Sequence, residues 1–285
     1  MSTQEITRCH RAAIIIAIDQ SCSMAERLCF KGNYMSKAEM VSLVTGRLID
    51  ELLLRSLRDE GYRNYYDVAI VGYRGNEVYP LLGNTINFVP ITALAEQNVA
   101  KRTFALRYDM PQDNTTLLFE EVSMWVEPRA EGATPMLKML TQLYDMVRKW
   151  CNEPQNIDSF PPIVCNITDG EASDGTSEQL IDAATRIRNL RTKDGNVIFA
   201  NIHLSSNSNI HSTIFPRAGE IYFESRQART LAEMSSVLPA RLEEYAALCR
   251  SDFATPPFLA MSYNASISEL IAMLNIGTRS LPPTL

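Results

Sequence analysis

Short unbroken apolar runs recur along the chain, and the segments between them carry apolar residues at helical spacing. Continuous runs rich in isoleucine and valine are typical of strands that are buried on both faces of a parallel sheet. Such runs occur at Ala12–Ile18, Asp67–Tyr73, Pro161–Ile167 and Asn196–Ile202. We therefore expect these four segments to be strands of a mostly parallel sheet.

Helix-start signals precede several of the intervening segments. In a capping box, a hydroxyl and an acid or amide side chain satisfy backbone N–H groups of the first helical turn. This pattern is present in the pairs Ser36 and Glu39, Thr176 and Gln179, and Ser266 and Glu269. The helix after Ser36 is expected to end near Gly61. Others are expected from Pro135 to about Trp150, and around 227–237 and 240–250.

Alternation of strands and helices predicts an α/β fold with a doubly wound, mostly parallel, Rossmann-like sheet and helices on both faces. Glu77–Leu82 is expected to pair with the preceding strand as one antiparallel edge strand, because proline is tolerated at a sheet edge. Ile221–Phe223 is expected to form a short last strand.

Two regions exceed this pattern. About 84–131 is longer than a simple connection, and its extended stretches predict a folded insertion containing a hairpin near the carboxyl ends of the strands. Two roles of this insertion remain open. It binds a ligand or partner, or it only adds packing at the edge of the sheet. We interpret 8–250 as one domain with this insertion, and 251–285 as a C-terminal extension with a short helix.

Hard oxygen donors follow two of the predicted strands. Asp19, Ser21 and Ser23 come at the end of the first strand, and Asp169 comes at the end of Pro161–Ile167. Thr134 stands just before a predicted helix. Ligand sites of α/β folds lie outside the carboxyl ends of the strands. Carboxylates and hydroxyls suit Mg²⁺ or Mn²⁺, so these five residues are candidate metal ligands.

The three segments D-x-S-x-S, G-x-T-P and T-D-G-E, in this order, resemble the metal-ion-dependent adhesion site of von Willebrand factor A domains and integrin inserted domains. The resemblance extends from about Arg11 to about Leu248. It implies that Ser21 and Ser23 bind the ion directly and that the two aspartates often act through water. In that family, the counterpart of Thr134 contacts the ion directly in the ligand-binding state. A partner's Asp or Glu carboxylate then completes the site.

Composition narrows the function classes. The net charge of −6 and the pI near 5.3 argue against nucleic-acid binding, which usually needs a basic face. No apolar run approaches the length needed to span a bilayer, and the N-terminal residues lack an apolar signal core. The six cysteines contain no Cys-x-x-Cys pair, which favours reduced thiols. We therefore expect a cytoplasmic location.

We predict a non-enzymatic function, in which the metal site captures an acidic residue of a protein partner. The resemblance to bacterial stress-response members of the family implies a bacterial cytosolic stress or signalling system. Two alternatives remain open at this point. One is a metal-dependent phosphoester hydrolase that uses Asp19 and Asp169, although Ser21 stands where haloacid-dehalogenase-type phosphatases need a second aspartate. The other is a scaffold that needs no metal. The sequence does not specify the oligomeric state.

Overall fold

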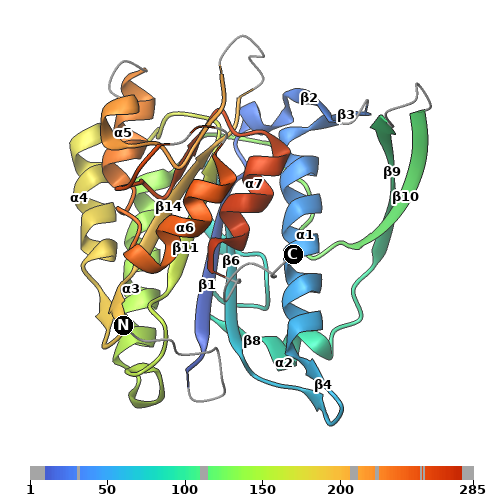
Figure 1. Ribbon diagram of the computed structural model, residues 1–285, viewed down its shortest axis with the longest axis horizontal. Coiled ribbons are helices and arrows are strands. Elements are labelled where there is room, and N and C mark those ends of the chain that lie inside the picture. Colours follow the sequence, from blue (N-terminus) through green and yellow to red (C-terminus); the bar gives the residue numbers. More distant parts are fainter. Residues whose placement is uncertain are drawn as a thin grey trace.

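Eight strands form the central sheet of the computed structural model, which describes residues 10–30, 33–109, 115–205, 211–221, 225–250, 252 and 254–277 (Figure 1). From one edge to the other their order is β15, β16, β14, β11, β1, β6 and β7, and β8 also pairs with β6. The bounds are β1 Ala12–Asp19, β6 Tyr66–Arg74, β7 Glu77–Pro80, β8 Val89–Pro90, β11 Ile163–Thr168, β14 Ile198–His203, β15 Thr213–Ile214 and β16 Met261–Tyr263.

The five central strands, from β16 to β6, are parallel, as the apolar runs predict. The antiparallel edge strand expected at Glu77–Leu82 is confirmed as β7. Two further antiparallel pairings were not anticipated: β8 pairs with β6, and β15 pairs with β16 at the opposite edge.

Helices cover both faces of the sheet, which confirms the doubly wound α/β fold (Figure 1). Alternate residues of β1 explain this. Ile14, Ile16 and Ile18 enter the apolar cluster under α1, α2, α6 and α7, whereas Ala13 and Ile15 enter the cluster under α3, α4 and α5. The bounds are α1 Lys37–Ser56, α2 Ile91–Ala95, α3 Met136–Asn152, α4 Ser177–Arg188, α5 Arg226–Met234, α6 Ala240–Cys249 and α7 Ile267–Leu274.

The three predicted capping boxes are all present, at the first turns of α1, α4 and α7. The prediction that the first helix reaches Gly61 is wrong, because α1 ends at Ser56. The chain there turns into a small ribbon of β4 (Leu57–Arg58) and β5 (Gly61–Tyr62). The other small ribbons pair β2 (Arg27–Phe30) with β3 (Asn33–Ser36) and β12 (Arg191–Thr192) with β13 (Gly195–Asn196).

The chain after residue 250 supplies a strand of the central sheet. β16 lies between β14 and β15, and α7 packs its buried leucines into the same cluster as α1. Of the strand expected at Ile221–Phe223, only Ile221 is within the described residues, where it is a bend and not a strand. The next parallel strand beside β14 therefore comes from Met261–Tyr263.

The long insertion contains the hairpin that its sequence predicts. β9 (Lys101–Asp109) and β10 (Thr115–Ser123) are antiparallel, and the turn between them lies outside the described residues. The hairpin runs along the outer side of α1 and ends at the level of β2 and β3 (Figure 1). Its base is anchored by Asp50 of α1, which accepts hydrogen bonds from Trp125 Nε1 at 3.0 Å and from Ser123 N at 3.3 Å.

Gly46 of α1 lies directly against the base of the hairpin. A Cβ built on Gly46 would lie 2.4 Å from the backbone oxygen of Ser123 and 3.0 Å from Val122 Cγ1. Alanine gains up to about 1 kcal/mol of helix propensity over glycine, but overpacking against a backbone atom typically costs about 1–3 kcal/mol. We expect Gly46→Ala to lower the free energy of unfolding and to increase hydrogen exchange in β10. Urea denaturation would measure the first effect.

The matched control is Gly219→Ala, because a Cβ at Gly219 meets nothing within 4 Å and its backbone lies outside the positive-φ region. If Gly46→Ala proves as stable as this control, the hairpin is not held tightly against α1.

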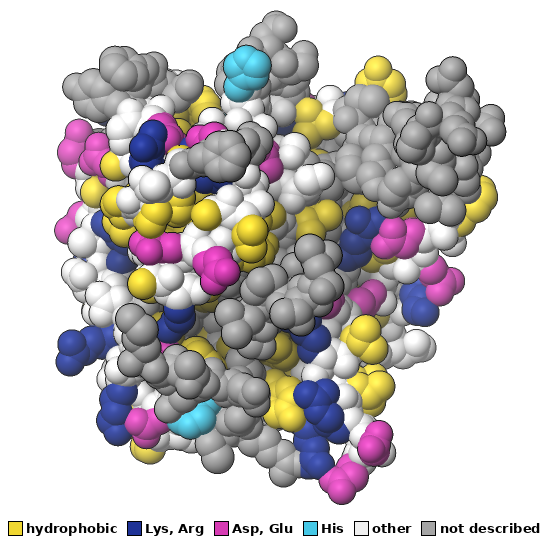
Figure 2. All heavy atoms as spheres, viewed as in Figure 1, with side chains coloured by type: hydrophobic (Ala, Val, Ile, Leu, Met, Phe, Trp, Pro, Cys, Tyr) yellow, Lys and Arg dark blue, Asp and Glu magenta, His cyan; other side chains and the backbone are white. Residues whose placement is uncertain are grey.

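Acidic and basic side chains are interspersed over the described part of the face shown in Figure 2. Within the described ranges, no helix is both long enough and apolar enough to cross a membrane.

Candidate metal site

Asp19 is the last residue of β1, and its side chain is fully buried. Its Oδ1 accepts a hydrogen bond from Ser21 N at 2.9 Å, and its Oδ2 accepts one from Thr168 Oγ1 at 2.7 Å. Burial raises the pKa of this carboxyl to about 6, and the nearby Asp169 acts in the same direction. Among the described residues, no Lys, Arg or His forms an ion pair with Asp19. Its negative charge is therefore poorly compensated.

Ser21 and Ser23 connect this carboxylate to the neighbouring strand. The chain leaves β1 extended at Ser21 and enters the short 3₁₀ helix η1 (Cys22–Ala25). The two hydroxyl oxygens lie 3.1 Å apart, and Ser23 Oγ donates to Asp169 Oδ1 at 2.6 Å. Asp169 directly follows β11, which is parallel to β1. The two strand ends therefore meet through their polar side chains, as the sequence predicts.

Thr134 comes from the loop before α3, and two hydrogen bonds to Ser173 fix its backbone. Thr134 N donates to Ser173 Oγ at 3.1 Å, and Ser173 N donates to Thr134 O at 2.9 Å. A Cβ built on Gly170 would lie 3.7 Å from Thr134 Oγ1 and 3.6 Å from Ser23 Oγ. Both hydroxyls therefore border the same point of the loop after β11.

Gly132 allows this loop to pass close to the edge of the sheet. Its φ of +77° favours glycine, and a Cβ there would lie 2.8 Å from the backbone nitrogen of Gly75. The loop is also held by backbone hydrogen bonds from Cys22 N to Gly132 O and from Glu131 N to Gln20 O. The G-x-T-P segment thus lies directly beside the D-x-S-x-S segment.

The structure therefore brings all five predicted site residues to the carboxyl ends of the central strands β1 and β11. Asp174, which the sequence left outside the ligand set, caps α3: its two carboxylate oxygens accept from Leu137 N and Lys138 N, each at 2.9 Å. Glu171 lines a neighbouring pocket. Whether Asp19, Ser21, Ser23, Thr134 and Asp169 bind a metal remains a prediction.

Lys37 is a residue of this site that the sequence analysis missed. It is the first residue of α1, it is almost fully buried, and its Nζ lies 2.7 Å from Asp169 Oδ2. A sequence signal existed. That signal was small: a lysine beside the capping residue Ser36 opposes the helix dipole by only about 0.3–1 kcal/mol at an exposed site, which does not name a partner.

His203, at the end of β14, adds no positive charge to the site at neutral pH. Its ring stacks on Tyr263 at a centroid distance of 4.7 Å, and burial lowers its pKa to about 4. The residue is 6% exposed, so its ring is part of the packing at the end of the strand.

A buried polar chain supports the strands beneath the site. Tyr73 Oη donates to Asn166 Oδ1 at 2.7 Å, and Asn166 Nδ2 donates to Asn201 Oδ1 at 3.0 Å. Asn201 Nδ2 continues to Ser235 Oγ at 3.0 Å. Because a buried polar group is costly unless it is hydrogen-bonded, this chain fixes β6, β11 and β14 relative to one another.

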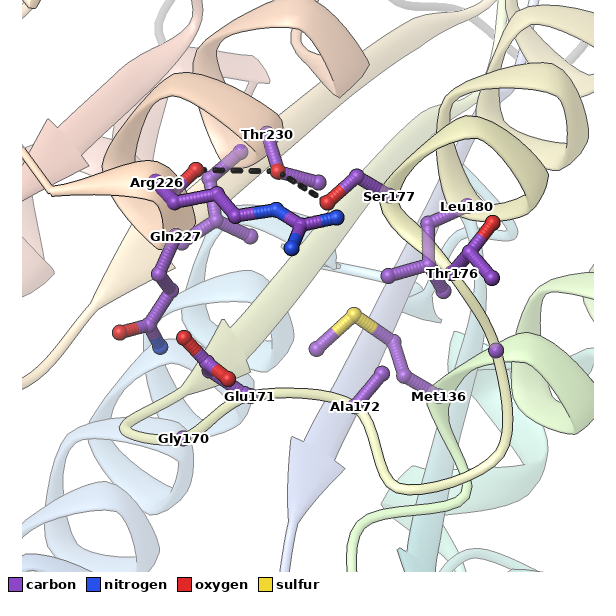
Figure 3. A pocket seen from close by; sticks show the side chains of 12 residues that line it. Met136, Gly170, Glu171, Ala172, Thr176, Ser177, Leu180, Arg226, Gln227 and Thr230 are labelled. Carbon is purple, nitrogen blue, oxygen red and sulfur yellow. Dashed lines mark hydrogen bonds between the residues drawn. The ribbon is translucent and has the colours of Figure 1, made fainter.

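A pocket of about 290 Å³ lies beside the site, between the loop after β11 and the first turns of α4 and α5. Gly170 and Met136 lie on its side toward the site. Figure 3 shows Arg226 extending over the pocket, Glu171 at its opposite rim and Leu180 in its wall.

The donor set fits a hard divalent cation. Three hydroxyls and two carboxylates come from three segments, and no basic side chain in the described part of the chain pairs with Asp19. Neutral hydroxyls and carboxylates are the oxygen ligands that Mg²⁺ and Mn²⁺ accept. The described residues contain no group of three or more His, Cys, Asp or Glu side chains placed to hold a metal ion. The candidate donor set differs from such a group because three of its five members are hydroxyls.

Comparisons with known proteins leave the family open. No family model matches the chain, and no curated protein matches it. The von Willebrand factor domain of the type V pili tip protein Mfa5 from Porphyromonas gingivalis is a similar solved structure, at 12% identity and a TM-score of 0.44. The likeness covers 96% of this chain and 98% of that one.

Two further solved structures are similar over part of their length. A von Willebrand factor type A protein from Catenulispora acidiphila is 14% identical (TM-score 0.39), over 69% of this chain and 33% of that one. Proximal thread matrix protein 1 from the mussel byssus, with a zinc-occupied MIDAS motif, is also 14% identical (TM-score 0.38), over 70% and 37% of the two chains. This chain thus spans about a third of the length of these two. All three likenesses are too low to support an argument about the site, and the α/β fold rests on the sheet order described above.

Proposed function

We propose that this chain is a protein-binding module that holds Mg²⁺ or Mn²⁺ at the carboxyl edge of its sheet and captures an Asp or Glu side chain of a protein partner. The observation that carries the proposal is the pair of hydroxyls of Ser21 and Ser23, 3.1 Å apart, between Asp19 and Asp169, with Thr134 beside the loop after Asp169. The Asp19 carboxylate is buried and forms no ion pair with a described basic residue. A cytosolic stress or signalling role in bacteria extends this proposal from the family resemblance.

In this arrangement Ser21, Ser23 and Thr134 would hold the cation through neutral hydroxyls, and Asp19 and Asp169 would hold it directly or through water. A bound divalent cation supplies positive charge that can accept one more anionic oxygen. Asp19, with its proton lost, provides the charge that retains the ion. Ser173, by fixing both sides of the Thr134 peptide, keeps the third hydroxyl directed at the loop after β11.

The neighbouring pocket gives the proposed partner a second point of contact. Its lining combines apolar Met136, Leu180 and Leu231 with the charged Arg226 and Glu171. A residue that flanks the captured acid in the partner sequence could occupy it. In this proposal the cation selects the carboxylate and the pocket selects its neighbour.

Two measurements test the function. Calorimetric titration with Mn²⁺ and Mg²⁺ should show binding of one ion per chain. A displayed random-peptide library selected in Mg²⁺ should then enrich sequences with an Asp or Glu whose amide variant does not bind, and chelator should release them. Enrichment that is indifferent to chelator would favour the metal-independent scaffold. Mg²⁺-dependent turnover of an aryl phosphate, lost in Asp19→Asn, would favour the hydrolase.

A further inference from the structure

Lys37 is a buried cation bound to the candidate site from the side of α1. Its Nζ lies 2.7 Å from Asp169 Oδ2 and 2.7 Å from Glu26 Oε2. The side chains of Lys37 and Asp169 are 3% and 0% exposed, whereas that of Glu26 is 52% exposed. Glu26 is thus the partner of Lys37 that solvent reaches.

This position is unfavourable for a lysine unless carboxylates compensate it. The ammonium is removed from water and lies in the first turn of α1, where the helix dipole disfavours a positive charge. Apolar packing or a hydroxyl would satisfy a helix start at lower electrostatic cost. The two carboxylates at 2.7 Å supply the compensation, and one of them is a candidate metal ligand.

The two oxygens of Asp169 are divided between the site and the lysine. Oδ1 accepts from Ser23 Oγ at 2.6 Å, on the side of the hydroxyl cluster, and Oδ2 pairs with Lys37. Part of the charge of Asp169 is therefore used by Lys37 and is unavailable to a divalent cation. Asp19 has no such competitor among the described basic residues.

We propose that Lys37 is the internal counter-cation of this site: it compensates Asp169 in the metal-free protein and competes with a divalent cation for that carboxylate. This inference rests on the proposed function, because it concerns the same site. Lys37 thereby lowers the affinity of the site for a divalent cation. Because the site then holds the cation less tightly, a bound cation depends more on a partner's carboxylate.

Glu26 controls how strongly Lys37 competes. It follows η1, the short helix that begins just after Ser21, and its backbone oxygen accepts from Lys37 N at 2.9 Å. Its carboxylate draws the ammonium away from Asp169, since one positive charge is shared between two negative ones. If the charge of Glu26 is removed, the ammonium of Lys37 pairs with Asp169 alone and competes more strongly with a divalent cation.

Mn²⁺ affinity, measured by calorimetry and by electron paramagnetic resonance of free Mn²⁺, distinguishes this role from a structural one. We expect Lys37→Gln to bind Mn²⁺ at least ten-fold more tightly than wild type, and Lys37→Arg to stay within about two-fold of it, because unit charges a few ångströms apart interact strongly in a protein. We expect Glu26→Gln to weaken binding about three-fold or more.

Glu131→Gln is the matched control for Glu26→Gln, because Glu131 is a similarly exposed carboxylate near the site that pairs with Arg74 and not with Lys37. If Glu26 acts through Lys37, its substitution should lose its effect in the Lys37→Gln background, which a double-mutant cycle reports. Thermal melts in chelator show whether each variant folds. If Lys37→Gln does not fold, the comparison of Glu26→Gln with Glu131→Gln still decides the question.

Unchanged Mn²⁺ affinity in a folded Lys37→Gln, or equal effects of Glu26→Gln and Glu131→Gln, would overturn the inference and leave the proposed function standing. Tight binding by Lys37→Gln with none by wild type would support the inference and contradict the metal-dependent function of the natural chain. Absence of binding in both proteins would overturn the two together.

Discussion

Asp19→Asn is expected to make the metal-free protein more stable at pH 7.5, by up to about 3 kcal/mol, and to abolish Mg²⁺ and Mn²⁺ binding. The first effect follows from the pKa of Asp19, which burial raises from 3.8 to about 6. A shift of one unit corresponds to about 1.4 kcal/mol. Asparagine keeps the shape: its oxygen can still accept from Ser21 N, and its NH₂ can donate to Thr168 Oγ1, whose own proton can turn to Gly170 O.

The sign of the pH dependence is specific. The pKa of Asp19 is higher in the folded than in the unfolded protein. Its contribution to the free energy of unfolding is therefore fully present below about pH 4 and is lost as the pH rises through about 6. The advantage of Asp19→Asn should therefore vanish near pH 4 and reach its maximum above pH 6. Urea denaturation in chelator across this range measures it.

Asp145→Asn is the control, because Asp145 is an exposed carboxylate on α3, about three helical turns beyond Thr134. It should change stability little and leave Mn²⁺ affinity intact. If Asp19→Asn is no more stable than wild type at pH 7.5, the carboxylate has a compensating cation. If it still binds Mn²⁺, Asp19 does not retain the ion.

Thr134→Ala is expected to separate cation binding from partner binding. The substitution removes one neutral hydroxyl and leaves both carboxylates, so Mn²⁺ affinity should fall by about three-fold or less. Affinity for an acidic peptide selected on the wild-type protein should fall by about ten-fold or more, because in the proposed function this hydroxyl contacts the cation that captures the peptide carboxylate. Carboxylates supply most of the retention of a hard cation, whereas a hydroxyl ligand adjusts its remaining attraction for an anion.

Calorimetry for the ion and fluorescence anisotropy for the labelled peptide, measured on the same preparations, make the comparison. Thr141→Ala is the matched control, since Thr141 is an exposed residue of α3 whose hydroxyl bonds only within the helix, to Leu137 O. If Thr134→Ala binds the peptide as tightly as the wild-type protein does, capture of the carboxylate does not depend on this hydroxyl. The proposed metal-bridged capture would then be wrong.

Much of the fold follows from local sequence patterns. The run from Ala12 to Ile18 specifies a strand buried on both faces, because alternate residues must each enter an apolar layer. Ser36 with Glu39 specifies where α1 begins, because the capping bonds are made within four residues. The candidate donors were also visible, because parallel strands necessarily bring their carboxyl ends to one edge.

Other features depended on contacts between residues distant in the sequence. Met261–Tyr263 is too short and too ordinary to be recognised as the strand beside β14, and pairing with β14 decided its role. The place of the β9–β10 hairpin was set by Asp50 and Gly46 of α1, neither of which has a signal pointing to residues some seventy positions later.

The charge balance of the site was likewise decided by the tertiary structure. By itself, the sequence determined an α/β sheet and a hydroxyl-rich edge that carries Asp19 and Asp169, because both follow from periodicity and strand order. It could not show that Asp19 is buried without an ion pair to any described basic residue, whereas Asp169 is paired with Lys37. That difference arises because the packing of α1 directs one buried ammonium to one carboxylate and not to the other, over 132 positions of sequence.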